Sequence, residues 1–540
     1  MPPYDPQMPQ RHQVIIVGGG PVGIALAVDL AQRGISCVVV ERHDGVGTIP
    51  KGQNLMHRSL EHFYFWGCVD ELRAARVLPQ GYPIGGITAY ESLMGEYWYM
   101  PEGLGGANTF FFQQNERLPQ YRTEEVLRAR LAKLPSASCR FRVAASSIDQ
   151  DEAGARVTVA STEWPYEEEV LEADFVVGCD GARSLVREQL GIERRGRDFD
   201  QKMALAVFRS AELDEGLARF PERTTYRVVH PDFEGKWLFF GRVGIGEWFF
   251  HGPVPRETGT EDRAAVLELM QKAAGFAFSC EFEHLGFWEL RIEVATRYRV
   301  GRGFIAGDAC HSHPPYGGLG LNTGLEDVAN LGWKLAGVLQ GWGGETLLDS
   351  YSAERQPIFE QTGEQVIASW IDTEATFLER FRPERDRPEF EEQWANRTGG
   401  EMAPSWYEPH YDSSPVVVGA PGNSTGIRGQ HELAARPGHH LSPQLLSSGR
   451  NVYEVLGRGF TLLAFGVATD EIEQLRAAAS GLGVPLEVIE DTFEDGRAAY
   501  GARLMLVRPD QFVAWCGEHA PEQPEMLFEV VAGLGARAER

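Results

Sequence analysis

Residues 13–42, QVIIVGGGPVGIALAVDLAQRGISCVVVER, read as one complete strand–helix–strand unit. The continuous apolar run VIIV predicts a parallel strand buried on both faces, residues 24–32 predict a helix, and the run CVVV predicts the next strand. Gly18, Gly20 and Gly23 stand between the first strand and the helix with the spacing G-x-G-x-x-G. This spacing provides a tight turn, a close approach of the backbone to a pyrophosphate, and close packing of the helix on the strand.

The residues around this turn complete a dinucleotide-binding pattern. The start of the helix directs unpaired N–H groups at phosphates, and Glu41 ends the second strand where a carboxylate accepts hydrogen bonds from ribose hydroxyls. The apolar stretch is also long enough to suggest a membrane span, but three consecutive glycines and Asp29 favour a strand, a turn and a helix. We therefore predict a Rossmann-like nucleotide-binding unit.

A second glycine-rich stretch, FIAGDACHSHPPYGGLGLNTG at residues 304–324, indicates which dinucleotide is bound. An apolar strand delivers Asp308 to the sheet edge where ligands of open α/β folds bind. There its carboxylate can bond the ribityl chain of a flavin. Free N–H groups of the glycine loop and of a helix start at Leu321–Asn322 can stabilise negative charge on the reduced isoalloxazine. This arrangement favours FAD.

Three motifs in a fixed order make the chain resemble the class A flavoprotein aromatic hydroxylases, the superfamily of p-hydroxybenzoate hydroxylase and phenol hydroxylase. They are GGGPVG with Glu41-Arg42 downstream, CDGARSLVR at 179–187, and GDACHSHPPYGGLGLN at 307–322. A smaller match, PKGQNLMHRSLE, has Lys51 where arginine is usual, which keeps the positive charge but loses the bidentate fork. The resemblance covers roughly residues 12–360.

Together with the glycine motif, the resemblance implies a set of cofactor-binding residues, FAD as the cofactor, and NADH or NADPH as the co-substrate. The expected cofactor-binding residues are Gly18, Gly20, Pro21, Val22, Gly23, Glu41, Arg42, Lys51, Gln120, Asp180, Gly307, Asp308, Pro315, Gly318, Gly320, Leu321 and Asn322.

The resemblance also implies a fold class: an α/β protein with a Rossmann-like FAD-binding domain of the glutathione-reductase type, a mainly antiparallel substrate sheet, and a C-terminal thioredoxin-like α/β domain. No CxxC occurs in the chain, so the last domain is expected to be structural or to form a homodimer. The expected bounds are 12–75, 119–199 and 296–375 for the FAD-binding domain, 76–118 and 200–295 for the substrate sheet, 376–430 for a linker, and 431–540 for the C-terminal domain.

Composition excludes several classes of partner. The net charge of -26 and the pI of about 5.0 argue against nucleic-acid binding and against docking on anionic lipid. Seven widely spaced cysteines indicate reduced thiols in a cytoplasmic protein and offer no zinc or disulfide framework, so no metal site is expected. The polar, proline-rich N-terminus does not read as a signal peptide.

The resemblance implies an NAD(P)H-dependent and O2-dependent monooxygenase that hydroxylates a phenolic substrate by way of a C4a-hydroperoxyflavin. Its setting would be aromatic catabolism or the tailoring of aromatic natural products. His313 and Tyr316 follow the strand that ends at Asp308 and are candidate catalytic residues of the pocket. Aromatic residues that alternate on predicted strands between 226 and 250 are expected to divide between the substrate pocket and the core.

Two alternatives stay open at this point. A flavin-dependent halogenase has a similar FAD domain, but none of the twelve tryptophans lies in a W-x-W-x-I-P signature. A non-catalytic FAD-fold binding protein would have no need of the flavin-ring contacts that the second and third motifs imply.

Overall fold

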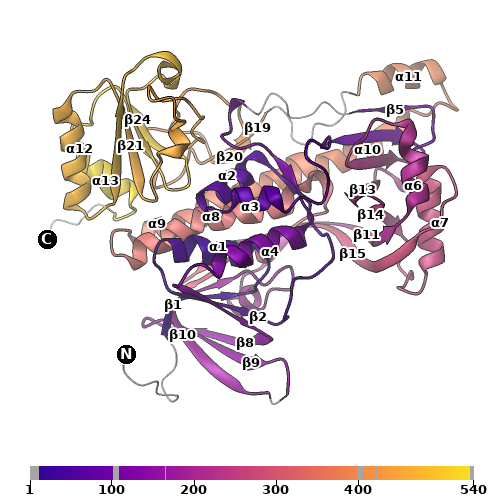
Figure 1. Ribbon diagram of the computed structural model, residues 1–540, viewed down its shortest axis with the longest axis horizontal. Helices are drawn as coiled ribbons and strands as arrows, with labels where there is room; N and C mark the ends of the chain where they lie inside the picture. Colours follow the sequence, from indigo (N-terminus) through magenta and orange to yellow (C-terminus); the bar gives the residue numbers. More distant parts are fainter. Residues whose placement is uncertain (1–10, 101–108, 165, 398–405, 421, 536–540) are drawn as a thin grey trace.

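The predicted strand–helix–strand unit forms the centre of a parallel sheet. The computed structural model describes residues 11–100, 109–164, 166–397, 406–420 and 422–535, so residues 1–10, whose composition argues against a signal peptide, lie outside it. The parallel strands run in the order β17, β10, β1, β2, β7, and β10 also pairs with an antiparallel extension (Figure 1). The strands of this sheet are β1 (Arg11–Val17), β2 (Cys37–Glu41), β7 (Ala137–Phe141), β8 (Val143–Gln150), β9 (Ala155–Ser161), β10 (Glu168–Gly178), β16 (Arg299–Val300) and β17 (Gly303–Ile305).

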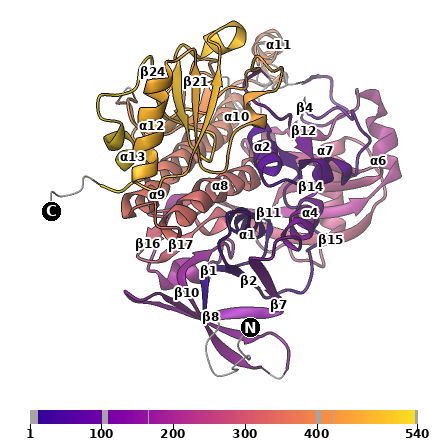
Figure 2. The same cartoon turned by 60° about the vertical axis from the view of Figure 1, so that its left-hand side comes forward.

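Helices cover this sheet and run through the middle of the molecule (Figure 2). The four apolar residues at the end of β1 are fully or almost fully buried, as expected of a central parallel strand. Pro21 opens α1, where a proline needs no N–H partner. The helices of this region are α1 (Pro21–Gln32), α2 (His57–Phe65), α3 (Val69–Ala74), α4 (Gln120–Leu131), α5 (Leu185–Gln189), α8 (Leu319–Leu339) and α9 (Glu345–Gln361).

A second sheet of eight strands has the order β18, β15, β11, β14, β13, β12, β4, β5. Only the β12–β4 pair is parallel, so the prediction of a mainly antiparallel sheet is confirmed. One face packs on α6 (Ala211–Gly216) and α7 (Arg263–Ala274) in a separate apolar cluster. The strands are β4 (Gly86–Tyr90), β5 (Trp98–Tyr99), β11 (Arg194–Arg209), β12 (Thr225–Val229), β13 (Leu238–Gly244), β14 (Glu247–Val254), β15 (Glu281–Ala295) and β18 (His311–Ser312).

The described parts of the stretch expected as a linker, 376–397, 406–420 and 422–430, contain a helix and two short strands. After α9 come a π-helical segment (Thr362–Ala368) and α10 (Ser369–Arg380), and then α11 (Arg387–Ala395) places Phe390 against Tyr90 of β4. The short strands β19 (Tyr407–His410) and β20 (Gly426–Arg428) pair with each other. Another two-stranded pair is formed by β3 (Asn54–Leu55) and β6 (Glu116–Arg117).

The C-terminal part forms its own α/β unit beside the ends of α8 and α9 (Figure 1). Its sheet has the order β22, β21, β23, β24, in which only β21–β22 is parallel. This β-α-β then β-β-α path is the thioredoxin-like arrangement that the sequence predicts. The elements are β21 (Phe460–Phe465), α12 (Thr469–Gly481), β22 (Leu486–Asp491), β23 (Leu504–Val507), β24 (Val513–Gly517) and α13 (Pro524–Val531). Among the described helices, none combines the length and the apolar run needed to span a membrane.

Candidate active site

One large cavity connects the two sheets. Its volume is about 1650 Å³, which exceeds the roughly 300–1,000 Å³ of a pocket for one small ligand. At one end lie the glycine turn after β1 and the end of β2, and at the other lies the face of the second sheet that is turned away from α7. The structure therefore joins a nucleotide-binding edge to a separate compartment with room for a second ligand.

The turn after β1 has the shape that a pyrophosphate needs. Gly18 has φ +105°, and a Cβ placed on it would lie 2.4 Å from the Cys179 carbonyl oxygen. A Cβ on Gly20 would meet nothing within 4 Å, because Gly20 faces the open cavity. The Gly19 and His43 N–H groups donate to the two oxygens of Glu41 at 2.7 and 2.8 Å, which fixes the carboxylate beside the turn.

Most of the expected cofactor-binding residues line this cavity. Those that do are Gly18, Gly20, Pro21, Val22, Glu41, Arg42, Lys51, Gln120, Asp180, Asp308, Pro315, Gly318, Gly320 and Leu321. Asp180 accepts from the Ser184 hydroxyl at 2.5 Å and from the Val186 N–H at 3.2 Å, and burial raises the pKa of its carboxyl.

Gly23, Gly307 and Asn322 do not line the cavity. A Cβ on Gly23 would lie 2.0 Å from the Gly18 carbonyl oxygen, so this glycine serves helix–strand packing as its spacing predicts. Gly307 has φ +62° and lies against Val22. Each glycine shapes the turn that the cavity-lining residues occupy.

Asn322 supports the cavity wall from behind. Its side chain accepts from the Met56 N–H at 2.8 Å and from the Ser59 hydroxyl at 2.6 Å. It donates to the Asn54 and Gly318 carbonyls at 2.8 and 2.7 Å. The two hydrogen bonds that its amide accepts and the two that it donates connect α2, β3 and the glycine loop.

The helix that follows the glycine loop begins earlier than the sequence suggested. Gly318 adopts a left-handed conformation (φ +69°) and caps α8, which begins at Leu319 rather than at Leu321–Asn322. Since the first N–H groups of a helix have no partner within it, those of Leu319, Gly320 and Leu321 belong to the open helix start. The Asn322 N–H, on the next residue, is the first that has a carbonyl partner within the helix.

Asp308 lies in the short turn Gly307–Ala309 and is exposed at the cavity edge. Arg194, from the start of β11, donates to the carbonyl oxygens of Asp308 and Ala309, the latter at 3.2 Å. Arg187 donates to the same Ala309 carbonyl at 3.4 Å and to Ala182 at 3.1 Å. The second and third motifs are thus tied together through backbone carbonyls, and the Asp308 carboxylate faces the cavity.

A row of directly opposed residues crosses seven strands of the second sheet on the cavity face. Residues directly opposite one another on neighbouring strands lie on the same face of a sheet. The row is Tyr99, Thr88, Arg227, Phe239, His251, Leu205 and Gly286, and every member lines the cavity.

The alternating aromatic residues divide as a two-residue period requires. Phe239 and Phe249 line the cavity, whereas Phe240, Phe250 and Trp248 belong to the apolar cluster beneath α7. Sequence alternation predicted two faces, but it did not say which face meets the cavity.

His251 is a neutral hydrogen-bond donor within this row. The Trp288 indole N–H donates to its Nδ1 at 3.1 Å, so the ring proton resides on Nε2. Burial lowers the pKa of His251 to about 3, and Phe239 stacks on the ring at 4.9 Å. The fixed tautomer leaves the Nε2–H as the polar group that this side chain offers to a ligand. The sequence did not single out His251. Its only signal was its position two residues after Phe249, which places both side chains on one face of the strand.

His313 and Tyr316 both line the cavity, on the loop before α8. His313 Nδ1 lies 2.5 Å from the Pro314 carbonyl, its Nε2 has no hydrogen-bond partner in the described chain, and burial lowers its pKa to about 4. The Tyr316 hydroxyl accepts from the Trp237 N–H at 3.2 Å, and the two rings stack at 4.3 Å. Burial raises the pKa of Tyr316 well above its usual value.

An arginine pair lines the cavity beyond Trp237. Arg227 stacks over the Trp237 ring at 4.3 Å, and its guanidinium lies 3.6 Å from Glu374. Arg397 forms a closer ion pair with the same carboxylate. Among the described residues, two guanidiniums face one carboxylate and leave an excess of positive charge at this end of the cavity, a feature that the sequence did not indicate.

The residues present fit FAD. The open space at Gly20, the fixed carboxylate of Glu41 and the exposed Asp308 all line one cavity, where they suit a pyrophosphate, a ribose and a ribityl chain respectively. The fold and the site therefore define a flavin-binding α/β enzyme with a second, aromatic-lined compartment.

Comparison with known proteins gives the family. Residues 11–366 match the family described as FAD binding domain, and residues 434–535 match the family described as aromatic-ring hydroxylase, C-terminal. The chain belongs to the FAD-dependent aromatic-ring hydroxylases and is a flavin-dependent monooxygenase.

Three similar proteins illustrate the relationship. The 4-methyl-5-nitrocatechol 5-monooxygenase of a Burkholderia species is 32% identical over 95% of this chain and 95% of its own. The structure of the flavin-dependent monooxygenase PieE with FAD and substrate has a TM-score of 0.84 and 26% identity, covering 98% of this chain and 99% of that one. The aklavinone-11 hydroxylase with FAD and aklavinone has a TM-score of 0.81 and 26% identity over 98% and 100% of the two chains.

Proposed function

We propose that the enzyme hydroxylates an electron-rich phenolic ring with O2, using NADH or NADPH as reductant. The observation that carries this proposal is the continuity of the cavity from the FAD-binding edge to the aromatic-lined face that holds His251. When bound, FAD supplies the redox chemistry and oxygen activation. The chain supplies orientation, exclusion of water and a polar contact for the substrate oxygen.

The substrate oxygen is assigned to His251. Hydroxylation of a phenol is favoured when its oxygen carries negative charge, and a fixed donor stabilises that charge without reorganisation. His251 Nε2–H fits this role because Trp288 fixes its tautomer and burial keeps it neutral. His313 and Tyr316 have pKa values far from neutrality, so we assign them to shaping the wall of the cavity rather than to proton exchange.

The lining row favours a substrate larger than one ring. It crosses six inter-strand spacings of about 4.8 Å, or roughly 29 Å, which is much longer than a single phenol. The positive charge of Arg227 and Arg397 suits an acidic or carbonyl-bearing substituent at the far end. Support for a multi-ring substrate also comes from the related hydroxylase whose structure contains aklavinone, and support for a small phenol comes from the nitrocatechol monooxygenase.

A substrate panel tests the proposal. The FAD-loaded enzyme is given NADH or NADPH with single-ring phenols and with multi-ring phenolic quinones, and NAD(P)H oxidation, O2 uptake and product mass are measured. We expect stimulated oxidation and a product heavier by one oxygen atom, most strongly with multi-ring compounds. A halogenated product in the presence of halide, or a flavin-loaded enzyme that oxygenates no phenol of the panel, would overturn it.

We further propose that the enzyme works in the cytoplasm, as its seven cysteines, all free thiols, suggest. Protein mass in solution tests whether the C-terminal unit forms a homodimer.

A further inference from the structure

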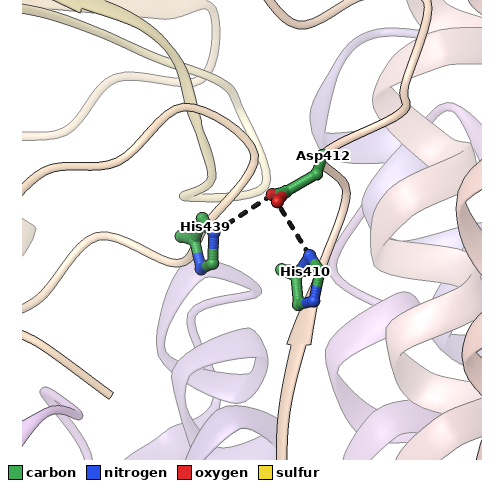
Figure 3. Close-up of side chains that lie close together, drawn as sticks. All are labelled: His410, Asp412 and His439. Carbon is green, nitrogen blue, oxygen red and sulfur yellow. Dashed lines mark ion pairs between the residues drawn. The ribbon is translucent and has the colours of Figure 1, made fainter. Parts of the chain in front are cut away.

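A buried cluster of two histidines and an aspartate lies outside the flavin cavity. His410 ends β19, Asp412 follows two residues later, and His439 comes from the loop that leads into the C-terminal unit. The side chains converge, with the Asp412 carboxylate between the two imidazoles (Figure 3). His410 Nδ1 and His439 Nε2 each lie 3.1 Å from Asp412 Oδ1, and each of the three residues is only 6% exposed.

These contacts do not form a satisfied hydrogen-bond network. Among the described residues, neither His410 Nδ1 nor Asp412 Oδ1 makes a well-directed hydrogen bond, although both atoms are buried. The planes of the two imidazole rings differ by 12°, and their centroids lie 4.9 Å apart. Since buried polar atoms nearly always have a partner, two orphaned atoms aimed at one point indicate a missing ligand.

The second nitrogen of His439 points to the identity of that ligand. Its Nδ1 lies 2.9 Å from Glu408 Oε1, and a carboxylate can only accept, so Nδ1 carries a proton. In the neutral ring, Nε2 then turns a lone pair toward the Asp412 oxygen. Two lone pairs at 3.1 Å repel each other unless a cation lies between them or His439 is doubly protonated.

The geometry matches metal coordination. Nitrogen and oxygen ligands at about 2.0–2.1 Å from a tetrahedral zinc ion lie roughly 3.3 Å apart. The two nitrogen–oxygen distances here are 3.1 Å, and the two nitrogens lie within 4.8 Å of each other. Glu408 bonded to the outer nitrogen of His439 reproduces the carboxylate–histidine–metal arrangement that fixes a metal-binding imidazole. Arginine and lysine side chains of the described chain do not pair with Asp412. Arg436 instead contacts the neighbouring carboxylate, Glu408, at 2.5 Å.

We propose that His410 Nδ1, Asp412 and His439 Nε2 bind one divalent transition-metal ion, with zinc as the expected metal and water as the fourth ligand. None of the three residues lines the flavin cavity, so the site is structural. The metal would cross-link residues 407–412 to the loop that enters the C-terminal unit, beside the Tyr411 N–H bond to the Gly438 carbonyl at 2.8 Å. The sequence offered no zinc motif because the ligands are spread from 410 to 439.

Metal analysis of the full-length, flavin-loaded enzyme tests the site. The enzyme is stripped with a chelator, dialysed against Zn²⁺, freed of loose metal and analysed by mass spectrometry. We expect about one zinc per chain in the wild type and less than about one tenth in His439→Gln and Asp412→Asn. His519→Gln, an exposed histidine paired with Glu471, is the matched control and should retain the wild-type content.

Thermal unfolding provides a readout that does not depend on activity. Zn²⁺ returned to the stripped wild type should raise the unfolding midpoint, but it should leave the midpoint of His439→Gln unchanged. If His439→Gln does not fold, His410→Gln and the stripped wild type provide the same comparison. A folded, flavin-loaded wild type that holds no zinc after dialysis would overturn the proposal in favour of a doubly protonated His439 between two carboxylates. Equal zinc in wild type and ligand variants would overturn the ligand assignment.

Discussion

At the scale of single residues, two glycines of the first turn have different structural requirements. A Cβ at Gly18 would clash with the Cys179 carbonyl and would demand a left-handed conformation, whereas a Cβ at Gly20 enters open cavity. We expect Gly18→Ala to lower the free energy of unfolding of the apoprotein by about 1–3 kcal/mol. We expect Gly20→Ala to leave that stability unchanged and to weaken FAD binding at least about tenfold, because the methyl occupies the pyrophosphate approach.

Flavin fluorescence titration and thermal unfolding of the apoproteins separate these two effects. Gly45→Ala is the matched control, since a Cβ there also meets nothing within 4 Å and Gly45 does not line the cavity. If Gly20→Ala bound FAD as tightly as Gly45→Ala, the turn would not be the pyrophosphate site.

His251 leads to a prediction about activity. His251→Leu removes the fixed donor, and we expect kcat/KM to fall about 100-fold, as for the loss of one preorganised donor to a developing anion. His251→Gln keeps an N–H group near the Nε2 position and should retain activity within about tenfold of the wild type. Steady-state kinetics with the best substrate of the panel, at equal flavin content, provide the measurement. Wild-type kcat/KM in His251→Leu would remove this residue from the mechanism.

At the scale of elements, the C-terminal unit provides counter-ions for a helix of the FAD-binding part. Glu354 of α9 is fully buried and contacts Arg508 at 2.7 and 2.9 Å and Lys334 of α8 at 2.6 Å. Arg508 also bonds Asp510, at 2.9 and 2.6 Å. Removing one partner of such a cluster strands a buried charge, whereas a satisfied cluster adds little.

We therefore expect Arg508→Met to lower the free energy of unfolding by about 3–5 kcal/mol and the thermal midpoint by roughly 3–4 °C. Arg476→Met, also in the C-terminal unit, is the control, because its exposed side chain pairs with the exposed Glu473 at 3.2 Å and should contribute less than about 1 kcal/mol. Calorimetry of the flavin-loaded proteins measures both midpoints. Similar shifts for the two variants would show that the cluster does not fasten α8 and α9 to the C-terminal unit.

How far the sequence could predict the structure depends on whether the contacts that fix a feature are close together or far apart in the sequence. The turn at Gly18 and the turn at Asp308 were predictable because the residues that shape each turn lie close together in the sequence. The helix start at Leu319 was misplaced by two residues, because nothing local shows that Gly318 takes the left-handed cap. The role of His251 depends on the strand register, which non-local packing fixes.

At the scale of the whole molecule, several histidines are buried as neutral groups, which gives the stability a defined dependence on pH. Burial lowers the pKa of His251 to about 3 and that of His313 to about 4, while both titrate near 6.5 in an unfolded chain. Between about pH 6.5 and 4, the unfolded chain therefore binds protons that the folded chain does not. The free energy of unfolding must fall as the pH falls through this window.

For each histidine the slope is at most about 1.4 kcal/mol per pH unit, since one proton is taken up on unfolding. Other buried groups titrate in the same range, so the informative quantity is the difference between the wild type and the double variant His251→Gln/His313→Gln. The free energy of unfolding of both proteins is measured with denaturant at pH 7.5, 6.5 and 5.5. On acidification the wild type should lose stability faster than the double variant, by at most twice the slope of a single histidine. Above pH 7 the difference in stability between the two proteins should stay constant. Parallel curves from pH 7.5 to 5.5 would mean that these rings accept protons in the folded state. That result would also withdraw the neutral, tautomer-fixed donor at the centre of the cavity, because a protonated ring carries a hydrogen on Nδ1, where the Trp288 indole N–H donates in the structure.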